Sequence, residues 1–122
     1  MHKENLSARE AMAKLEEGNK HYLSASTNPG DISPELRKAT CENGQSPYAI
    51  VITCSDSRVV PEDIFTAGIG ELFVIRVAGN VMDRHQLGSV EYGVEHLGCR
   101  LVVVLGHDHC GAVGAAIHDE PS

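Results

Sequence analysis

Three short apolar runs, separated by segments of helical character, constrain the fold most strongly. The runs are residues 48–53, 72–77 and 101–105, and each is rich in β-branched residues without clean alternation of apolar and polar positions. That pattern is typical of strands buried on both faces of a parallel sheet. A short helical piece at 61–67 and a longer helix at 86–97 separate the runs. This order predicts an α/β fold, in which a central, mostly parallel β-sheet with right-handed crossovers is flanked by helices.

The chain of 122 residues is expected to form a single domain, residues 1–122, in two parts. Residues 1–45 are predicted to form an N-terminal helical arm, and residues 46–122 the α/β core. Within the arm, a set of mostly apolar residues recurs at helical spacing over residues 7–23, which predicts an amphipathic helix. Ser33 followed by Pro34 predicts the start of a second, short helix, with serine as the cap and proline at the first position.

Charge and cysteine content narrow the classes of function. A formal net charge of −7 argues against nucleic acid or an anionic membrane as the main partner. The longest apolar runs have the length of strands, and the N-terminus lacks the apolar centre of a signal peptide. We therefore expect a cytoplasmic protein without a membrane span. Thiols stay reduced in the cytoplasm, so the four cysteines indicate metal binding or catalysis before disulfides.

Cysteine and histidine side chains follow two of the three runs. Cys54 comes immediately after the first run, and His107 comes shortly after the third. Because open parallel sheets bind ligands outside the carboxyl ends of their strands, these two side chains can meet at one edge of the sheet. Cys110 lies three positions after His107, a spacing that lets a loop entering a helix offer both side chains to one ion. Zinc favours thiolate and imidazole ligands in a tetrahedron, so the pattern predicts a zinc site with its fourth position left to water.

An acidic and a basic residue stand close to the first cysteine. Asp56 and Arg58 alternate with Cys54, so in extended backbone all three side chains would share a side. A carboxylate beside the open coordination position can bind zinc itself and close the site. Alternatively it can pair with Arg58, whose guanidinium makes two parallel hydrogen bonds, and leave room for water.

Four stretches together resemble the β-carbonic anhydrase family. They are CSDSRVVPEDIF, FVIRVAGNV, SVEYGVEHLG and VVVLGHDHCGAV, in the family's order, and EAMAKLEEGNKHYL resembles the N-terminal helix of bacterial members. The resemblance runs from about residue 10 to residue 117. It implies that Cys54, His107 and Cys110 are the ligands of one zinc ion per chain. It also implies that Asp56 and Arg58 form the family's Asp–Arg dyad, with Asp56 a zinc ligand in the closed form only.

The resemblance further implies an activity, the reversible hydration of carbon dioxide to bicarbonate and a proton by zinc-bound hydroxide. Asp56 would accept a hydrogen bond from the hydroxide, and Arg58 would hold Asp56 off the metal. The amide of Gly111, at the start of a helix, would bind oxygen atoms of the substrate. Members of the family assemble as homodimers or larger homo-oligomers, with the N-terminal helix, here residues 7–23, reaching a partner.

Several alternatives stay open at this point. The chain ends twelve residues after Cys110, whereas family members usually continue, so we expect the C-terminal part of the family domain to be absent. The same zinc site would also suit a hydrolase of COS or CS₂, and a truncated chain could be an inactive zinc-binding protein. Without a metal, the ligand set would be a buried thiol pair and a core histidine. Cys41 and Cys99 have no partner at ligand spacing and are interpreted as small packing residues.

Overall fold

The computed structural model describes residues 4–118 and has the α/β architecture that the sequence predicts. Along the chain the elements are α1 (Ala8–Ser24), α2 (Pro34–Asn43), β1 (Ala49–Thr53), α3 (Pro61–Ile64), β2 (Leu72–Arg76), the 3₁₀ helix η1 (Ala78–Asn80), α4 (Arg84–Glu95), β3 (Val102–Val104) and α5 (Gly111–His118). No helix in this part of the chain is long and apolar enough to cross a membrane.

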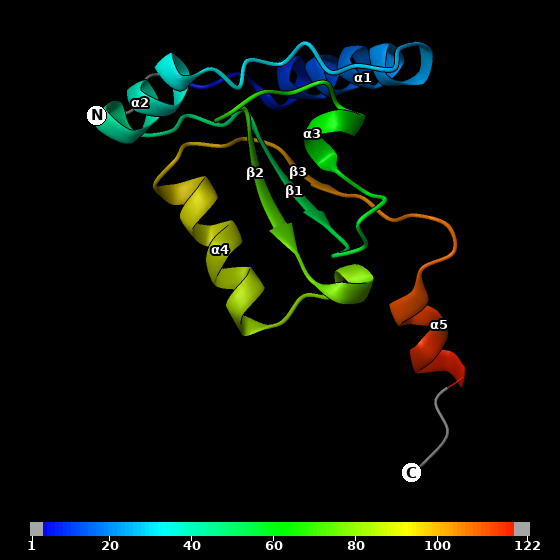
Figure 1. Cartoon of the computed structure of the whole chain (residues 1–122). Coiled ribbons are helices and arrows are strands. Elements are labelled where there is room, and N and C mark those ends of the chain that lie inside the picture. The colour runs from blue at the N-terminus through cyan, green and yellow to red at the C-terminus, as the bar shows by residue number, and fades with distance from the viewer. Residues whose placement is uncertain (1–3, 119–122) are drawn as a thin grey trace.

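The three strands form one parallel sheet in the order β2-β1-β3, with β1 in the centre (Figure 1). Val51 lies opposite Val74 of β2 and Val103 of β3, which fixes the register on both sides. Parallel neighbours need crossover connections, which the segments containing α3 and α4 provide. All three strands therefore end at the same edge of the sheet, and the loops that follow β1 and β3 leave from that edge.

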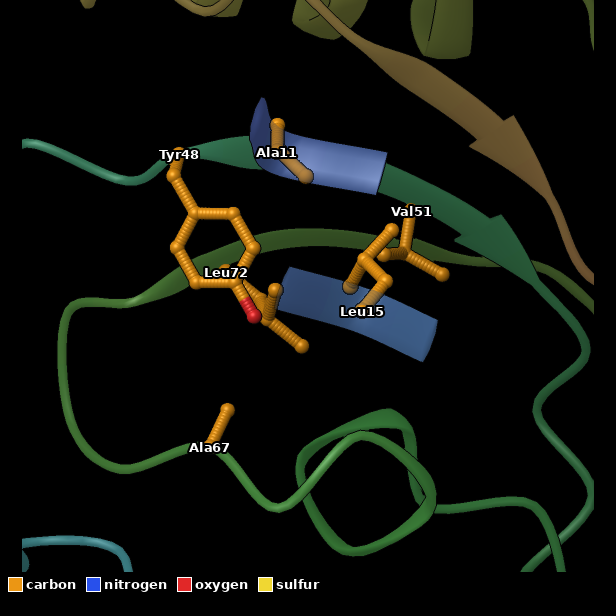
Figure 2. Packing of buried hydrophobic residues seen from close by; sticks show 7 residues of the cluster. Ala11, Leu15, Tyr48, Val51, Ala67 and Leu72 are labelled. Carbon is orange, nitrogen blue, oxygen red and sulfur yellow. The ribbon is translucent and has the colours of Figure 1, made fainter. Parts of the chain in front are cut away.

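Two hydrophobic clusters lie on opposite faces of β1, because successive side chains of a strand point to opposite faces. On one face Ala11 and Leu15 of α1 pack against Tyr48 and Val51 (Figure 2). On the other face a second cluster contains these buried residues: Ile50, Ile52, Ile75, Leu97 and Cys99. Burial of Cys99 confirms its interpretation as a packing residue, and its thiol donates to the carbonyl oxygen of Pro47 at 3.1 Å.

The sequence predicts burial on both faces for all three strands, and the structure bears this out only for β1. All five residues of β1 are buried, whereas Val102 and Val104 of β3 are 40% and 63% exposed. β3 is an edge strand in the described structure, and the cluster around Ile50 and Ile52 does not extend to it. The prediction is therefore wrong for β3: Val103 packs against the cluster on the α1 face, but Val102 and Val104 lack a covering layer in residues 4–118.

Helix α1 is held by its cap and by a close approach to the segment around α3. Ser7 and Glu10 form a capping box at its N-terminus. A Cβ on Gly18 would overlap the carbonyl oxygen of Phe65, so only glycine permits this approach. The hydroxyl of Thr66 donates to the carbonyl oxygen of Gly18 at 2.7 Å. These contacts fix α1 against the core of its own chain.

Candidate metal centre

The three predicted ligands converge at the carboxyl edge of the sheet. Cys54 directly follows β1, His107 lies in the loop after β3, and Cys110 directly precedes α5. One ligand atom from each of these residues lies within 4.8 Å of the other two. The fold thus brings together side chains that are more than fifty positions apart, because parallel strands end at a common edge.

The spacing of the two sulfur atoms suits a tetrahedral metal. The Sγ atoms of Cys54 and Cys110 are 3.8 Å apart. With metal–sulfur bonds of about 2.3 Å, the edge of a zinc tetrahedron measures roughly 3.8 Å. Both cysteines are free thiols, so the pair is not a disulfide. The separation therefore already has the value that shared coordination of one zinc ion requires.

The imidazole of His107 is oriented as a metal-binding histidine would be. Its Nδ1 donates a hydrogen bond to the carbonyl oxygen of Asp108 at 2.9 Å, which leaves the lone pair on Nε2. Nε2 is buried and has no hydrogen-bond partner in the part of the chain that the structure describes. A buried acceptor without a partner is costly in a folded protein, and coordination of a cation at Nε2 would remove that cost.

Cys54 is placed to act as a thiolate. Its side chain is buried, and its sulfur accepts the N–H of Gly79 at 3.2 Å. The pKa of Cys54 is lowered to about 6, mainly by interaction with the His107 ring and secondly by the hydrogen bond from the Gly79 amide. In turn the Cys54 sulfur is the main cause that raises the pKa of His107 above its ordinary value. Since the thiolate is the form that binds metals, the lowered pKa favours Cys54 as a ligand.

Asp56 and Arg58 form a bidentate ion pair beside this group. Arg58 donates from Nε to Oδ1 of Asp56 at 3.0 Å and from Nη2 to Oδ2 at 2.7 Å. These bonds hold the pKa of Asp56 well below its usual range. Oδ2 of Asp56 is also 3.9 Å from Nε2 of His107, so the carboxylate borders the predicted metal position.

The backbone that presents this dyad forms a turn. In extended backbone the side chains of Cys54, Asp56 and Arg58 would share a side, but the segment turns at Arg58, and the N–H of Val59 bonds to the carbonyl of Asp56 at 3.0 Å. The backbone N–H of Arg58 bonds to Oδ1 of Asp56 at 2.9 Å, which is the reason that the turn forms. Asp56 and Arg58 therefore meet across a turn and not along extended backbone.

Arg58 also joins the loops that follow β1 and β3. Its Nη2 donates to the carbonyl oxygen of His109 at 2.8 Å. His109 has a positive φ of 56°, a left-handed conformation that side chains other than glycine adopt at some cost. Gly111 begins α5, as the sequence predicts, and its role towards a substrate stays a prediction. Cys41 is exposed on α2, so its interpretation as a packing residue is wrong.

Two contributors to this edge of the sheet were missed in the sequence. Gly79 supplies the N–H that bonds to the Cys54 sulfur, at a position with φ of 79°. Arg76, the last residue of β2, donates to carbonyl oxygens of the loop that follows Cys54. The sequence does hold a signal for both residues, because Arg76 interrupts the apolar run 72–77 and lies three positions before Gly79.

Comparisons with known proteins agree with this geometry. The family described as carbonic anhydrase matches residues 49–122. Carbonic anhydrase 2 of Mycobacterium tuberculosis is 46% identical over 107 residues, which are 88% of this chain and 51% of that protein. The chain spans about half the length of the curated relatives it matches.

Solved structures extend the likeness to the fold. The β-carbonic anhydrase CafA of Aspergillus fumigatus matches with a TM-score of 0.66 and 31% identity, over 93% of this chain and 52% of that one. A tetrameric β-carbonic anhydrase of Sordaria macrospora matches with a TM-score of 0.65 and 27% identity, over 93% of this chain and 54% of that one. Together, the sequence match, these folds and the Cys–His–Cys group establish that the chain belongs to the β-carbonic anhydrase family.

Proposed function

We propose that this chain catalyses the zinc-dependent, reversible hydration of carbon dioxide to bicarbonate and a proton, with one zinc ion per chain. The observation that carries the proposal is the convergence of Cys54, His107 and Cys110 beside a bidentate Asp–Arg pair. Membership of the carbonic anhydrase family supports the choice of substrate. The matched residues span about half the length of the named relative.

The chain's own residues supply the coordination that such chemistry needs. Cys54, His107 and Cys110 would hold the ion as two thiolates and one imidazole, and a tetrahedral ion then keeps one position open. When bound, zinc lowers the pKa of a water molecule at that position to near neutrality. The bond from Nδ1 of His107 to the Asp108 carbonyl would keep the ring oriented.

Asp56 and Arg58 would control the open position. With both of its oxygens bonded to Arg58, Asp56 stays ionised and can accept a hydrogen bond from a group bound at the open position. The same two bonds restrain the carboxylate from becoming a fourth ligand. Loss of the ion pair would free Asp56 to bind the metal, which is the closed form. The amide of Gly111 would donate to oxygen atoms of the substrate.

Association with further copies of the chain is part of this proposal, as is a cytoplasmic location. Several large apolar side chains near the N-terminus are exposed, among them Leu23 at 76% and Ile32 at 71%. Apolar groups at such exposure suit an interface between copies. A related structure is described as tetrameric. Light scattering of the zinc-loaded chain should give a homodimer or larger, and a stable monomer would remove this part of the proposal.

The proposal is tested by stopped-flow measurement of carbon dioxide hydration with zinc quantified in the same samples. We expect one zinc ion per chain and hydration activity in the wild type, and loss of both in Cys110→Ser. Cys41→Ser is the matched control, because Cys41 is an exposed cysteine outside the ligand group. It should keep zinc and activity.

Two results would replace the proposed function. Full zinc content without hydration in the folded wild type would favour a non-catalytic zinc-binding protein. Faster hydrolysis of COS or CS₂ than hydration of carbon dioxide would keep the zinc site and change the substrate.

A further inference from the structure

The loop that carries Cys54 and Asp56 begins where the sheet stops supplying hydrogen bonds. β1 and β2 stay paired to their last residues, Thr53 and Arg76, and the N–H of Val77 still bonds to the carbonyl of Thr53 at 3.1 Å. From Cys54 onward the chain leaves the sheet. The carbonyl oxygens of Cys54 and Val59 accept no backbone hydrogen bond among the loop and turn bonds of the described residues. A loop in this position needs donors from a side chain to be fixed.

The guanidinium of Arg76 supplies those donors. Its Nε donates to the carbonyl oxygen of Cys54 at 2.9 Å. Its Nη2 donates to the carbonyl oxygens of Asp56 at 2.7 Å and Val59 at 2.8 Å. One side chain thus binds both ends and the middle of the segment that contains a predicted ligand and the predicted gating carboxylate.

We propose that Arg76 is a positioning residue of the metal centre, which fixes the Cys54–Val59 loop so that the Cys54 sulfur and the Asp56 carboxylate face the ion together. The inference deepens the proposed function and relies on it for the presence of the metal. Arg76 itself does not touch the metal position: its hydrogen bonds reach backbone oxygens, and no salt bridge within residues 4–118 includes it.

Arginine is the side chain that can do this. The guanidinium is planar and carries five N–H donors in a fixed fork, so it can serve several carbonyls at once. The ammonium of lysine is a compact charge with freely rotating donors and cannot reproduce the fork. Because Arg76 is an exposed residue, it makes these bonds without burying its charge. Arg76→Lys therefore keeps the charge and removes the geometry.

The test compares zinc affinity of the full chain as wild type, Arg76→Lys and Arg76→Ala, by competition with a chromophoric chelator. Arg100→Lys is the matched control, since Arg100 makes an exposed ion pair with Glu4 at 3.8 Å. Visible spectra of the cobalt-loaded proteins report the ligand geometry, and melting temperatures of the metal-free proteins report global stability. We expect a loss of zinc affinity of roughly tenfold or more in both Arg76 variants, as is typical for partners that orient ligands.

The cobalt spectrum should change in Arg76→Lys and stay unchanged in Arg100→Lys. Zinc affinities and cobalt spectra equal to wild type in Arg76→Lys would overturn the inference. It would also fall if the loss of affinity merely followed a lower melting temperature of the metal-free protein. An inactive wild type whose zinc affinity depends on Arg76 would refute the proposed function alone. An active wild type with unaffected Arg76 variants would refute this inference alone.

Discussion

The sheet has a well-packed side, formed by β1 and β2, and an open side, formed by β3, the loop that follows it and α5. On one side, β1 and β2 lie between α1 and α4, and all five residues of β1 are buried. On the other side, β3 exposes Val102 and Val104, and α5 has no buried residue. The candidate metal centre lies at their junction, because Cys54 follows the packed side whereas His107 and Cys110 belong to the open side.

This difference indicates how the site is ordered. Cys54 and Asp56 are held by the core and by the bonds from Arg76. The loop with His107 and Cys110 is joined to the loop after β1 by the bond from Arg58 to the His109 carbonyl. A bound ion would join the two sides, so metal binding and the order of the open side should be coupled.

The largest expected difference between the two sides is in the free energy of unfolding, when one valine on each side is replaced by alanine. Val51→Ala removes two buried methyl groups at a fully buried position and should lower the free energy of unfolding by about 2 to 3 kcal/mol. Val104→Ala, at 63% exposure, should change it by less than about 0.5 kcal/mol. Urea denaturation of both variants measures the contrast, and equal losses would show that β3 is as well packed as β1.

A second pair of variants lies within the single helix α4. A Cβ on Gly93 would come within 2.6 Å of Cδ1 of Ile50, so Gly93→Ala should cost roughly 1 to 3 kcal/mol through overpacking. A Cβ on Gly88 would meet no atom within 4 Å, so Gly88→Ala should stabilise the helix by up to about 1 kcal/mol. Thermal denaturation distinguishes them. A stabilising Gly93→Ala would mean that α4 is not tightly packed on β1.

Removal of zinc should affect the two sides differently. The N–H of Gly114 bonds to the carbonyl of Cys110 at 3.0 Å in α5, and the N–H of Tyr48, directly before β1, bonds to the carbonyl of Glu71, directly before β2, at 2.9 Å. After chelation we expect hydrogen exchange at Gly114 to accelerate about tenfold or more, and at Tyr48 by less than about threefold. Equal acceleration at the Gly114 and Tyr48 amides would contradict a local coupling between the metal and the open side.

A further comparison concerns two buried cysteines of the metal-free chain. The pKa of Cys54 is lowered to about 6, chiefly by His107, while burial raises the pKa of Cys99 to about 11. The stabilisation that Cys54 gives as a thiolate is present above its ordinary pKa of 9 and is lost as the pH falls through about 6. That of Cys99 is present below pH 9 and is lost as the pH rises through about 11.

Thiolate absorbance followed against pH measures both groups. One thiolate should form near pH 6 in the wild type, and this step should move towards higher pH in His107→Ala. A titration without any step below pH 8 would exclude the interaction between Cys54 and His107 in the metal-free protein.

The sequence was informative where a pattern is local. Three β-branched runs predicted the strands, and the rule that ligands gather at the carboxyl ends of parallel strands predicted that Cys54 would meet His107 and Cys110. The strands follow from local residue type, and the meeting of the ligands follows from the common direction of parallel strands. Neither prediction needs the positions of side chains.

What the sequence could not provide depends on contacts between distant segments. Exposure of Val104 depends on what covers the edge of the sheet, and the hydropathy of the strand does not contain that information. The turn at Arg58 arises from its own bond to Asp56, which competes with extended backbone. The bonds from Arg76 to the loop follow from its register opposite Thr53, which places its guanidinium beside the loop.

In the proposed metal centre, two sulfur atoms and one imidazole nitrogen from both sides of the sheet hold a single zinc ion. X-ray absorption spectroscopy of the zinc-loaded chain identifies these ligands. We predict two sulfur ligands at about 2.3 Å and two nitrogen or oxygen ligands at about 2.0 to 2.1 Å. A zinc ion with one sulfur ligand or none would contradict the account.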